Sequence, residues 1–317
     1  MKAMVDGVWR TDVEATPAYR AAAERWRFRD WVSADGSSDY RAAPGRYHLY
    51  VSYACPFAHR TLLGRALLGL EEAISISVLD PDWGGPTGWV FGAPPAATPD
   101  HVNGLASLPE VYRKASPHFT GRVTVPALWD RDRATIVNNE SAEILRMLET
   151  EFRAFADPRI ELYSEALRAE IEEINAFVGP RVNGGVYRAG FAPTQEAYDA
   201  AVIDLFAALD ALEAHLGSCD FLVGERLTEA DLRLFPTLVR FDVAYYGALR
   251  CNLKRLVDYP RLHAYTRRIW ALPKVAETVR LDHVKRHYWD DHEMINRRIV
   301  PIGPKVEFDD FPVAQAA

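Results

Sequence analysis

Cysteine is scarce in this chain, which has only three, Cys55, Cys219 and Cys251, among 317 residues. The odd number argues against a disulfide framework, and no Cys-x-x-Cys pair is present to suggest a zinc site or a dithiol redox centre. We therefore expect no metal, and a reducing cytoplasm is the default compartment.

Long apolar runs and an excess of positive charge are also missing. No segment approaches the length of a membrane span, and residues 1–10 hold no apolar run typical of a signal peptide. The formal charge is −7 and the pI is near 5.8, which argues against binding to nucleic acid, because that role needs a concentrated basic face. We expect neither a membrane nor a nucleic acid as a partner.

The sequence does contain a distinctive junction between a strand and a helix. A stretch rich in aromatic and β-branched residues begins at Tyr47 and predicts a buried strand that ends at Cys55. Pro56 then favours a helix start, because the amide that proline lacks would have no intrahelical partner. The free N–H groups of Phe57 and Ala58 should point toward the sulfur and favour a thiolate at neutral pH. The alternative is that Cys55 is a small buried hydrophobic residue, as free cysteines usually are.

The remaining pattern predicts α/β structure followed by all-α structure. The pattern after this junction predicts a strand over 74–79, a hairpin over 123–137 and a helix beginning near Glu140. These elements complete the β-α-β and β-β-α order of a thioredoxin-like domain. We expect this domain, together with an N-terminal arm, to occupy residues 1–155. The loop over 80–122, with Trp83, Trp89 and Phe91, is expected to overhang a site. Residues 156–317 have helical periodicity, with an extended tail over 281–317 because of Pro301 and Pro304.

This combination is similar to the glutathione transferase superfamily, and six blocks resemble the glutathionyl-hydroquinone reductases of the Xi class. The blocks span nearly the whole chain: Tyr53-Ala54-Cys55-Pro56-Phe57-Ala58-His59-Arg60, Gly88-Trp89-Val90-Phe91, Gly121-Arg122-Val123-Thr124-Val125-Pro126, Ile136-Val137-Asn138-Asn139-Glu140-Ser141, Gly185-Val186-Tyr187-Arg188-Ala189-Gly190-Phe191 and Lys285-Arg286-His287-Tyr288.

The resemblance implies an enzyme in which a cysteine removes glutathione from a glutathionyl-hydroquinone, and a second glutathione resolves the resulting mixed disulfide to glutathione disulfide. It also implies a homodimer, with glutathione as co-substrate. Cys55 would be the nucleophile, and Tyr187 and Tyr288 would face the hydroquinone. The implied glutathione-binding residues are Trp89, Arg122, Val125, Glu140 and Ser141.

Each glutathione-binding assignment has a chemical basis and a simpler alternative. At a helix start, Ser141 can bind the γ-glutamyl carboxylate while Glu140 pairs with the ammonium, although Glu140 could merely complement the helix dipole. The backbone of Val125 can pair with glutathione as an added strand does, and Val125 can also be a core residue. Arg122 could bind the glycyl carboxylate or be a solvated surface residue. Trp89 could cover glutathione or simply pack.

The sequence departs from the pattern of this family at two positions. Phe57 stands where the family usually has Trp, and Arg297 stands where the tail usually has Pro. His59 follows Cys55 by four residues, but its neighbour Leu63 favours a packed helix histidine.

The alternative enzyme is an Omega-like cysteine glutathione transferase, acting as a thiol transferase or dehydroascorbate reductase, which needs no Tyr187 or Tyr288. The non-enzymatic alternative is an assembly module, which needs no reactive cysteine.

Overall fold

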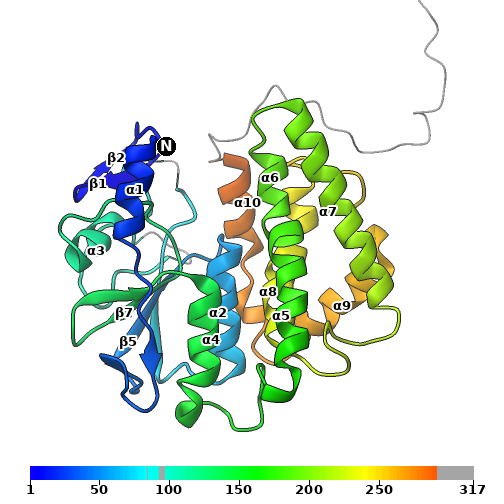
Figure 1. Ribbon diagram of the computed structural model, residues 1–317, viewed down its shortest axis with the longest axis horizontal. Helices are drawn as coiled ribbons and strands as arrows, with labels where there is room; N and C mark the ends of the chain where they lie inside the picture. Colours follow the sequence, from blue (N-terminus) through cyan, green and yellow to red (C-terminus); the bar gives the residue numbers. More distant parts are fainter. Residues whose placement is uncertain (84, 93–96, 291–317) are drawn as a thin grey trace, which may run out of the picture.

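The computed structural model describes residues 1–83, 85–92 and 97–290 and has a mixed sheet beside a set of helices (Figure 1). The sheet has the order β6-β5-β7-β8, in which β5 and β6 are parallel and the other pairs antiparallel. This confirms the thioredoxin-like topology. Its strands are β5 (Tyr47–Val51), β6 (Ile74–Val78), β7 (Ala127–Asp130) and β8 (Thr135–Asn138).

Two helices pack together beside this sheet, α2 (Pro56–Leu67) and α4 (Ser141–Thr150). They approach closely at Gly64, where a Cβ atom would lie 2.5 Å from Leu145 Cδ1. The strand before α2 ends at Val51, earlier than predicted, and a turn leads from Ser52 to Cys55. The loop over 80–122 contains a helix that we did not predict, α3 (Leu108–Ala115), although Ser107 and Glu110 form the capping box that marks its start.

The N-terminal arm packs beside the sheet through β1 (Ala3–Val5), β2 (Val8–Arg10), α1 (Pro17–Arg25), β3 (Val32–Ser33) and β4 (Tyr40–Arg41). Met4 forms a bridge with Gly121, and Phe28 stacks on Phe119 with ring centroids 5.5 Å apart. Trp26 and Trp31 are exposed. The arm is thus tied to the sheet by a few anchors.

The second half of the chain is helical, as predicted. Its helices are α5 (Arg168–Val178), α6 (Gly185–Gly190), α7 (Gln195–His215), α8 (Glu229–Arg240), α9 (Pro260–Trp270) and α10 (Leu281–Asp290). Short turns of 3-10 or π type are η1 (Arg153–Phe155), η2 (Glu165–Leu167), η3 (Gly179–Asn183), η4 (Phe241–Tyr245), η5 (Leu256–Asp258) and η6 (Ala276–Thr278). None of the helices in the described part of the chain is both long and apolar enough to span a membrane.

The prediction of an extended segment from residue 281 is wrong for residues 281–290, which form α10. Val284 and Tyr288 are buried on one face of this helix, and that packing stabilises it. Pro301 and Pro304, on which the prediction rested, lie outside the described residues, as does Arg297.

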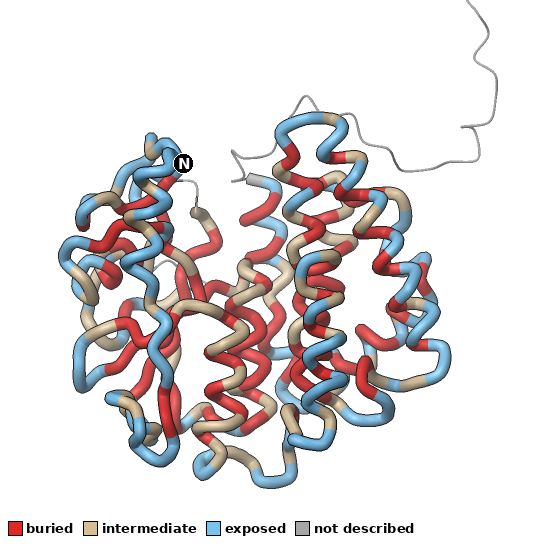
Figure 2. Tube along the Cα trace, viewed as in Figure 1, coloured by how far each residue is buried: buried red, intermediate tan, exposed pale blue. Residues whose placement is uncertain are grey.

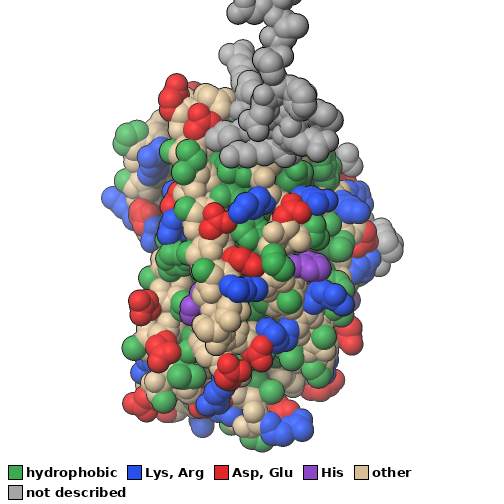
Figure 3. Space-filling model, turned by 90° about the vertical axis from the view of Figure 1, so that its right-hand side faces the viewer, with side chains coloured by type: hydrophobic (Ala, Val, Ile, Leu, Met, Phe, Trp, Pro, Cys, Tyr) green, Lys and Arg blue, Asp and Glu red, His purple; other side chains and the backbone are tan. Residues whose placement is uncertain are grey.

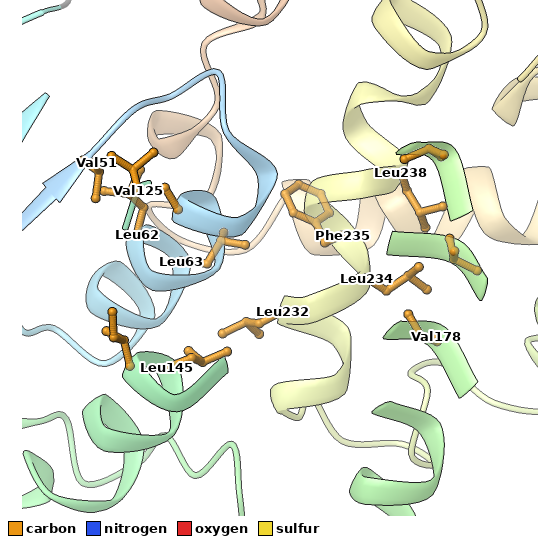
Figure 4. Packing of buried hydrophobic residues seen from close by; sticks show 14 of the residues in the cluster. Val51, Leu62, Leu63, Val125, Leu145, Val178, Leu232, Leu234, Phe235 and Leu238 are labelled. Atoms are coloured by element: carbon orange, nitrogen blue, oxygen red, sulfur yellow. The ribbon is translucent and has the colours of Figure 1, made fainter. Parts of the chain in front are cut away.

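The two halves share a continuous core (Figure 2). Figure 4 shows Leu63 of α2 and Leu145 of α4 on one side of the contact and Leu232 and Phe235 of α8 on the other. On the face of the molecule in Figure 3, basic and acidic side chains are interspersed. Surface ion pairs such as that of Lys254 with Asp210 neutralise these charges locally.

A cluster of charged side chains also lies between the halves and predicts how stability depends on pH. Glu229 is fully buried and pairs with Arg146 at 2.5 Å and with Arg233. Burial and the charge of Glu229 raise the pKa of Glu149 well above the ordinary value of 4.5. The folded state therefore keeps a proton that the unfolded chain loses above that pH, so the contribution of Glu149 to stability falls as pH rises.

We expect Glu149→Gln, which mimics the protonated acid, to melt at a higher temperature than the wild type at pH 8. The difference should shrink toward pH 4.5, because near that pH the unfolded wild-type acid also takes up a proton. Thermal unfolding at both pH values measures this. The exposed Glu173→Gln variant is the control, and an equal shift for both variants at both pH values would contradict the burial argument.

Candidate active site

A cavity of about 500 Å³ brings together every site residue predicted from the sequence. This volume is within the usual range for small-molecule sites. The predicted residues in its lining come from both halves of the chain: Cys55, Trp89, Arg122, Val125, Glu140, Ser141, Tyr187 and Tyr288.

Cys55 is the N-cap residue of α2, with extended backbone angles and Pro56 next to it. The N–H groups of Phe57 and Ala58 act to lower the pKa of its thiol, in the direction predicted, and the thiol donates to the Val125 carbonyl at 3.6 Å. Burial nevertheless raises the pKa of the Cys55 thiol, because loss of solvent outweighs these N–H groups and the nearby guanidinium groups of Arg240 and Arg60. The prediction of a thiolate at neutral pH is therefore wrong for this state of the protein.

One end of the cavity is formed by the start of α4. Glu140 is the N-cap, and its Oε1 accepts hydrogen bonds from the Ala142 N–H and the Ser141 hydroxyl, both at 3.3 Å. Arg60 donates to the Ser141 hydroxyl, also at 3.3 Å. This end thus combines a helix N-terminus, a hydroxyl and a buried cation, which suits a carboxylate, with the Glu140 carboxylate beside it for an ammonium.

The other glutathione candidates differ in exposure. Val125 is buried and precedes Pro126 through a cis peptide bond, and no described residue accepts a hydrogen bond from its N–H. Arg122 is exposed and makes no ion pair with the described residues. Trp89 is buried and stacks on His287, with centroids 5.5 Å apart and an interplanar angle of 12°. Trp89 therefore packs and lines the cavity at the same time.

The two tyrosines meet although they are 101 residues apart in sequence: their hydroxyl oxygens are 2.5 Å apart. Tyr187 comes from α6 and also stacks on Phe57, with centroids 5.9 Å apart. Tyr288 comes from α10, and its hydroxyl lies 3.5 Å from that of Tyr245. Burial raises the pKa of both Tyr187 and Tyr288, so both phenols keep their protons and remain hydrogen-bond donors.

His59 does not pair with Cys55. It is fully buried, with Nε2 at 2.8 Å from Thr278 Oγ1 and Nδ1 at 2.9 Å from Arg240 Nη1, as expected for a packed histidine. Of the other cysteines, Cys251 is buried and Cys219 is half-buried, and neither lines the cavity. Among the described residues there is no cluster of His, Cys, Asp and Glu suited to a metal.

The cavity wall also contains residues that were not predicted from the sequence to bind glutathione or to act in catalysis. They are Pro56, Phe57, Trp83, Val123, Thr124, Pro126, Asn139, Gly184, Phe191 and His287. All but Trp83 and Gly184 lie within the six sequence blocks, so the blocks already pointed to most of the cavity wall. Trp83 and Trp89 of the loop over 80–122 line the cavity, whereas Phe91 does not.

Comparison with known proteins agrees with this geometry. Residues 54–151 match the family model "Glutathione S-transferase, N-terminal domain", and residues 195–268 match "Glutathione S-transferase, C-terminal domain". The glutathionyl-hydroquinone reductase PcpF of Sphingobium chlorophenolicum is 46% identical, over 96% of both chains.

Two solved structures are also similar. The Xi class glutathione transferase from Natrialba magadii has a TM-score of 0.89 and 45% identity, covering 98% of this chain and 95% of its own. The glutathione-bound structure of YqjG, from Escherichia coli K-12, has a TM-score of 0.84 and 44% identity, covering 97% of each chain.

Proposed function

The chain belongs to the glutathione S-transferase family, in its Xi class, and from this premise we propose that it is a glutathionyl-hydroquinone reductase that works through Cys55. The observation that carries the mechanism is the shared cavity. The same cavity is lined by a thiol at a helix start, by the polar start of α4 and by a pair of phenols that share a hydrogen bond.

The proposed reaction has two steps. In the first, the ring carbon takes up a proton, the Cys55 sulfur attacks the sulfur of the glutathionyl group, and the bond from that sulfur to the ring breaks. The products are the hydroquinone and a mixed disulfide between Cys55 and glutathione. In the second step a glutathione thiolate attacks this disulfide, which gives glutathione disulfide and restores the Cys55 thiol. The ring carbon is reduced and two glutathione sulfurs are oxidised.

We place glutathione along the wall formed by Val125 and the start of α4. The γ-glutamyl carboxylate lies at Ser141, its ammonium at Glu140, and the cysteinyl backbone pairs with Val125 as an added strand. The glycyl carboxylate lies at Arg122, and Trp89 covers the peptide. This arrangement leaves the hydroquinone ring beside Tyr187 and Tyr288.

The direct test is to incubate the protein with a glutathionyl-hydroquinone and excess glutathione, and to measure hydroquinone and glutathione disulfide by chromatography. Equal amounts of both products are expected. Reduction of small mixed disulfides or dehydroascorbate without release of hydroquinone would favour the Omega-like transferase, and no thiol chemistry at all would favour an assembly module.

Arg122→Ala is expected to weaken glutathione binding by about tenfold, since a charge-assisted hydrogen bond contributes about 1.5 kcal/mol or more. The melting temperature should hardly change, because Arg122 is exposed and has no described ion-pair partner. Calorimetric titration with glutathione measures the affinity. Arg113→Ala, an exposed arginine on α3 outside the cavity, is the matched control. Equal glutathione affinities of the Arg122→Ala and Arg113→Ala variants would show that Arg122 does not bind glutathione.

We also propose the domain division at residues 1–155 and 156–317, a homodimer, and a cytoplasmic location. The division is supported by the change from sheet to helices after α4 and η1. The location is supported by the free state of the three cysteines.

A further inference from the structure

Arg240 of α8 is a fully buried arginine that reaches the turn before Cys55. Its Nη2 donates to the Tyr53 carbonyl at 2.8 Å, and its Nε donates to the Ala54 carbonyl at 3.2 Å. Its Nη1 donates to the Pro236 carbonyl at 2.8 Å and to His59 Nδ1 at 2.9 Å. One side chain from the helical half therefore binds the two residues that precede the candidate nucleophile.

All of these acceptors are neutral. An arginine can only donate, so Nδ1 of His59 is an acceptor, and the proton of the imidazole is on Nε2, which donates to Thr278. Burial and the charge of Arg240 lower the pKa of His59 well below its ordinary value, which agrees with a neutral ring.

In the described part of the chain no carboxylate forms an ion pair with Arg240, whereas Arg146 at the same domain contact pairs with Glu229. Burying a charge without a counter-ion costs free energy of folding, so a role for the charge of Arg240 is expected. The Tyr53 and Ala54 contacts suggest one, because the next residue is Cys55, and the charge of Arg240 acts to lower the pKa of that thiol.

The other ionisable groups that face Cys55 neither replace the charge of Arg240 nor neutralise it. Arg60 from α2 also favours the thiolate, but its guanidinium is engaged with Ser141 and lies 4.9 Å from the centroid of the Phe57 ring. Tyr187 from α6 and Tyr245 from η4 keep their protons, because burial raises the pKa of each phenol. His287 from α10 is neutral, since burial lowers its pKa to about 4. None of these groups is an anion that would neutralise Arg240.

We propose that Arg240 is a positioning residue that holds the turn over Tyr53 and Ala54 and supplies the buried positive charge that the Cys55 thiolate neutralises when it forms. The inference rests on the proposed role of Cys55 as nucleophile. It means that the thiol of the thioredoxin-like half reaches its reactive state only when α8 of the helical half is docked against it.

The test is the pH dependence of Cys55 alkylation by iodoacetamide, followed by mass spectrometry in the full-length protein without any hydroquinone. Arg240→Met removes the charge, and the alkylation midpoint should rise by about one pH unit or more. At a fixed pH below the midpoint, alkylation should then be about tenfold slower. Arg240→Lys keeps the charge but not the four hydrogen bonds, so its midpoint should stay near that of the wild type while turnover falls.

Arg65→Met is the matched control, because Arg65 of α2 also donates to backbone carbonyls, those of Ile74 and Glu71, and lies outside the cavity. Its midpoint should not change. If Arg240→Met does not fold, Arg240→Gln carries the same prediction, since it keeps amide donors but loses the charge. An unchanged midpoint in the folded neutral variant, or an equal rise in Arg240→Lys, would overturn the proposal. Neither result depends on which substrate the enzyme reduces.

Discussion

Cys55→Ser is expected to lower the rate of glutathionyl-hydroquinone reduction by roughly 10⁴-fold or more, the scale of loss when an enzyme nucleophile is removed. A hydroxyl at the start of α2 would be a far weaker nucleophile toward sulfur than the thiol. Glutathione should still bind, because the contacts proposed for it with Val125, Ser141 and Arg122 do not involve the thiol. Turnover is measured from hydroquinone release, and binding by calorimetry.

The control for this prediction is Cys219→Ser, which changes a half-buried cysteine outside the cavity. That variant should retain wild-type turnover. Mass spectrometry of the wild type with substrate, but without free glutathione, should find one glutathionyl group on Cys55. Wild-type turnover by Cys55→Ser would show that another group attacks the substrate.

Tyr187→Phe or Tyr288→Phe is expected to lower hydroquinone release by about 10²–10³-fold, the usual loss when one donor to a developing oxyanion is removed. In the proposed reaction the ring carbon first takes up its proton to give a keto tautomer, so that the electrons of the carbon–sulfur bond pass to a ring oxygen when that bond breaks. Phenol donors aimed at the ring oxygens would stabilise the charge that develops there. Phenylalanine keeps the ring packing against Phe57 or Tyr245 but lacks the donor.

The hydrogen bond between the two phenols adds a further expectation. Because the oxygens are 2.5 Å apart, one hydroxyl orients the other, and removal of either one disturbs both. The double variant should therefore lose little more than the worse single variant, since residues that act as a unit are not additive. Steady-state kinetics on all three variants measures this.

Reduction of a small glutathione mixed disulfide is the second activity to measure, because it distinguishes a role in hydroquinone release from a structural role. Its leaving thiolate needs no phenol donor, so each tyrosine variant should retain most of that activity. Tyr198→Phe is the matched control, because its buried hydroxyl donates to the Arg250 carbonyl away from the cavity. A parallel loss of both activities in the Tyr187 and Tyr288 variants would make these tyrosines structural and would favour the Omega-like alternative.

Local sequence signals predicted local structure well. Alternating or continuous apolar residues predicted the strands, and the strand-to-helix junction at Cys55 followed from Pro56. Thr228 and Asp231 likewise form a capping box, a local pattern, at the start of α8. The failures were α3, whose capping box lies in a loop rich in Pro and Gly, and α10, whose stability comes from burial of Val284 and Tyr288.

The sequence by itself determined which residues stand at the N-terminus of α2 and at the N-terminus of α4, because helix starts depend on neighbours a few positions away. Only the tertiary structure decided the electrostatics of the site. It partly buried Cys55 and so raised the pKa of the thiol, it joined Tyr187 to Tyr288, and it brought Arg240 to the turn before Cys55. Desolvation and contacts between distant residues arise only when the two halves pack together, so no local pattern could have specified them.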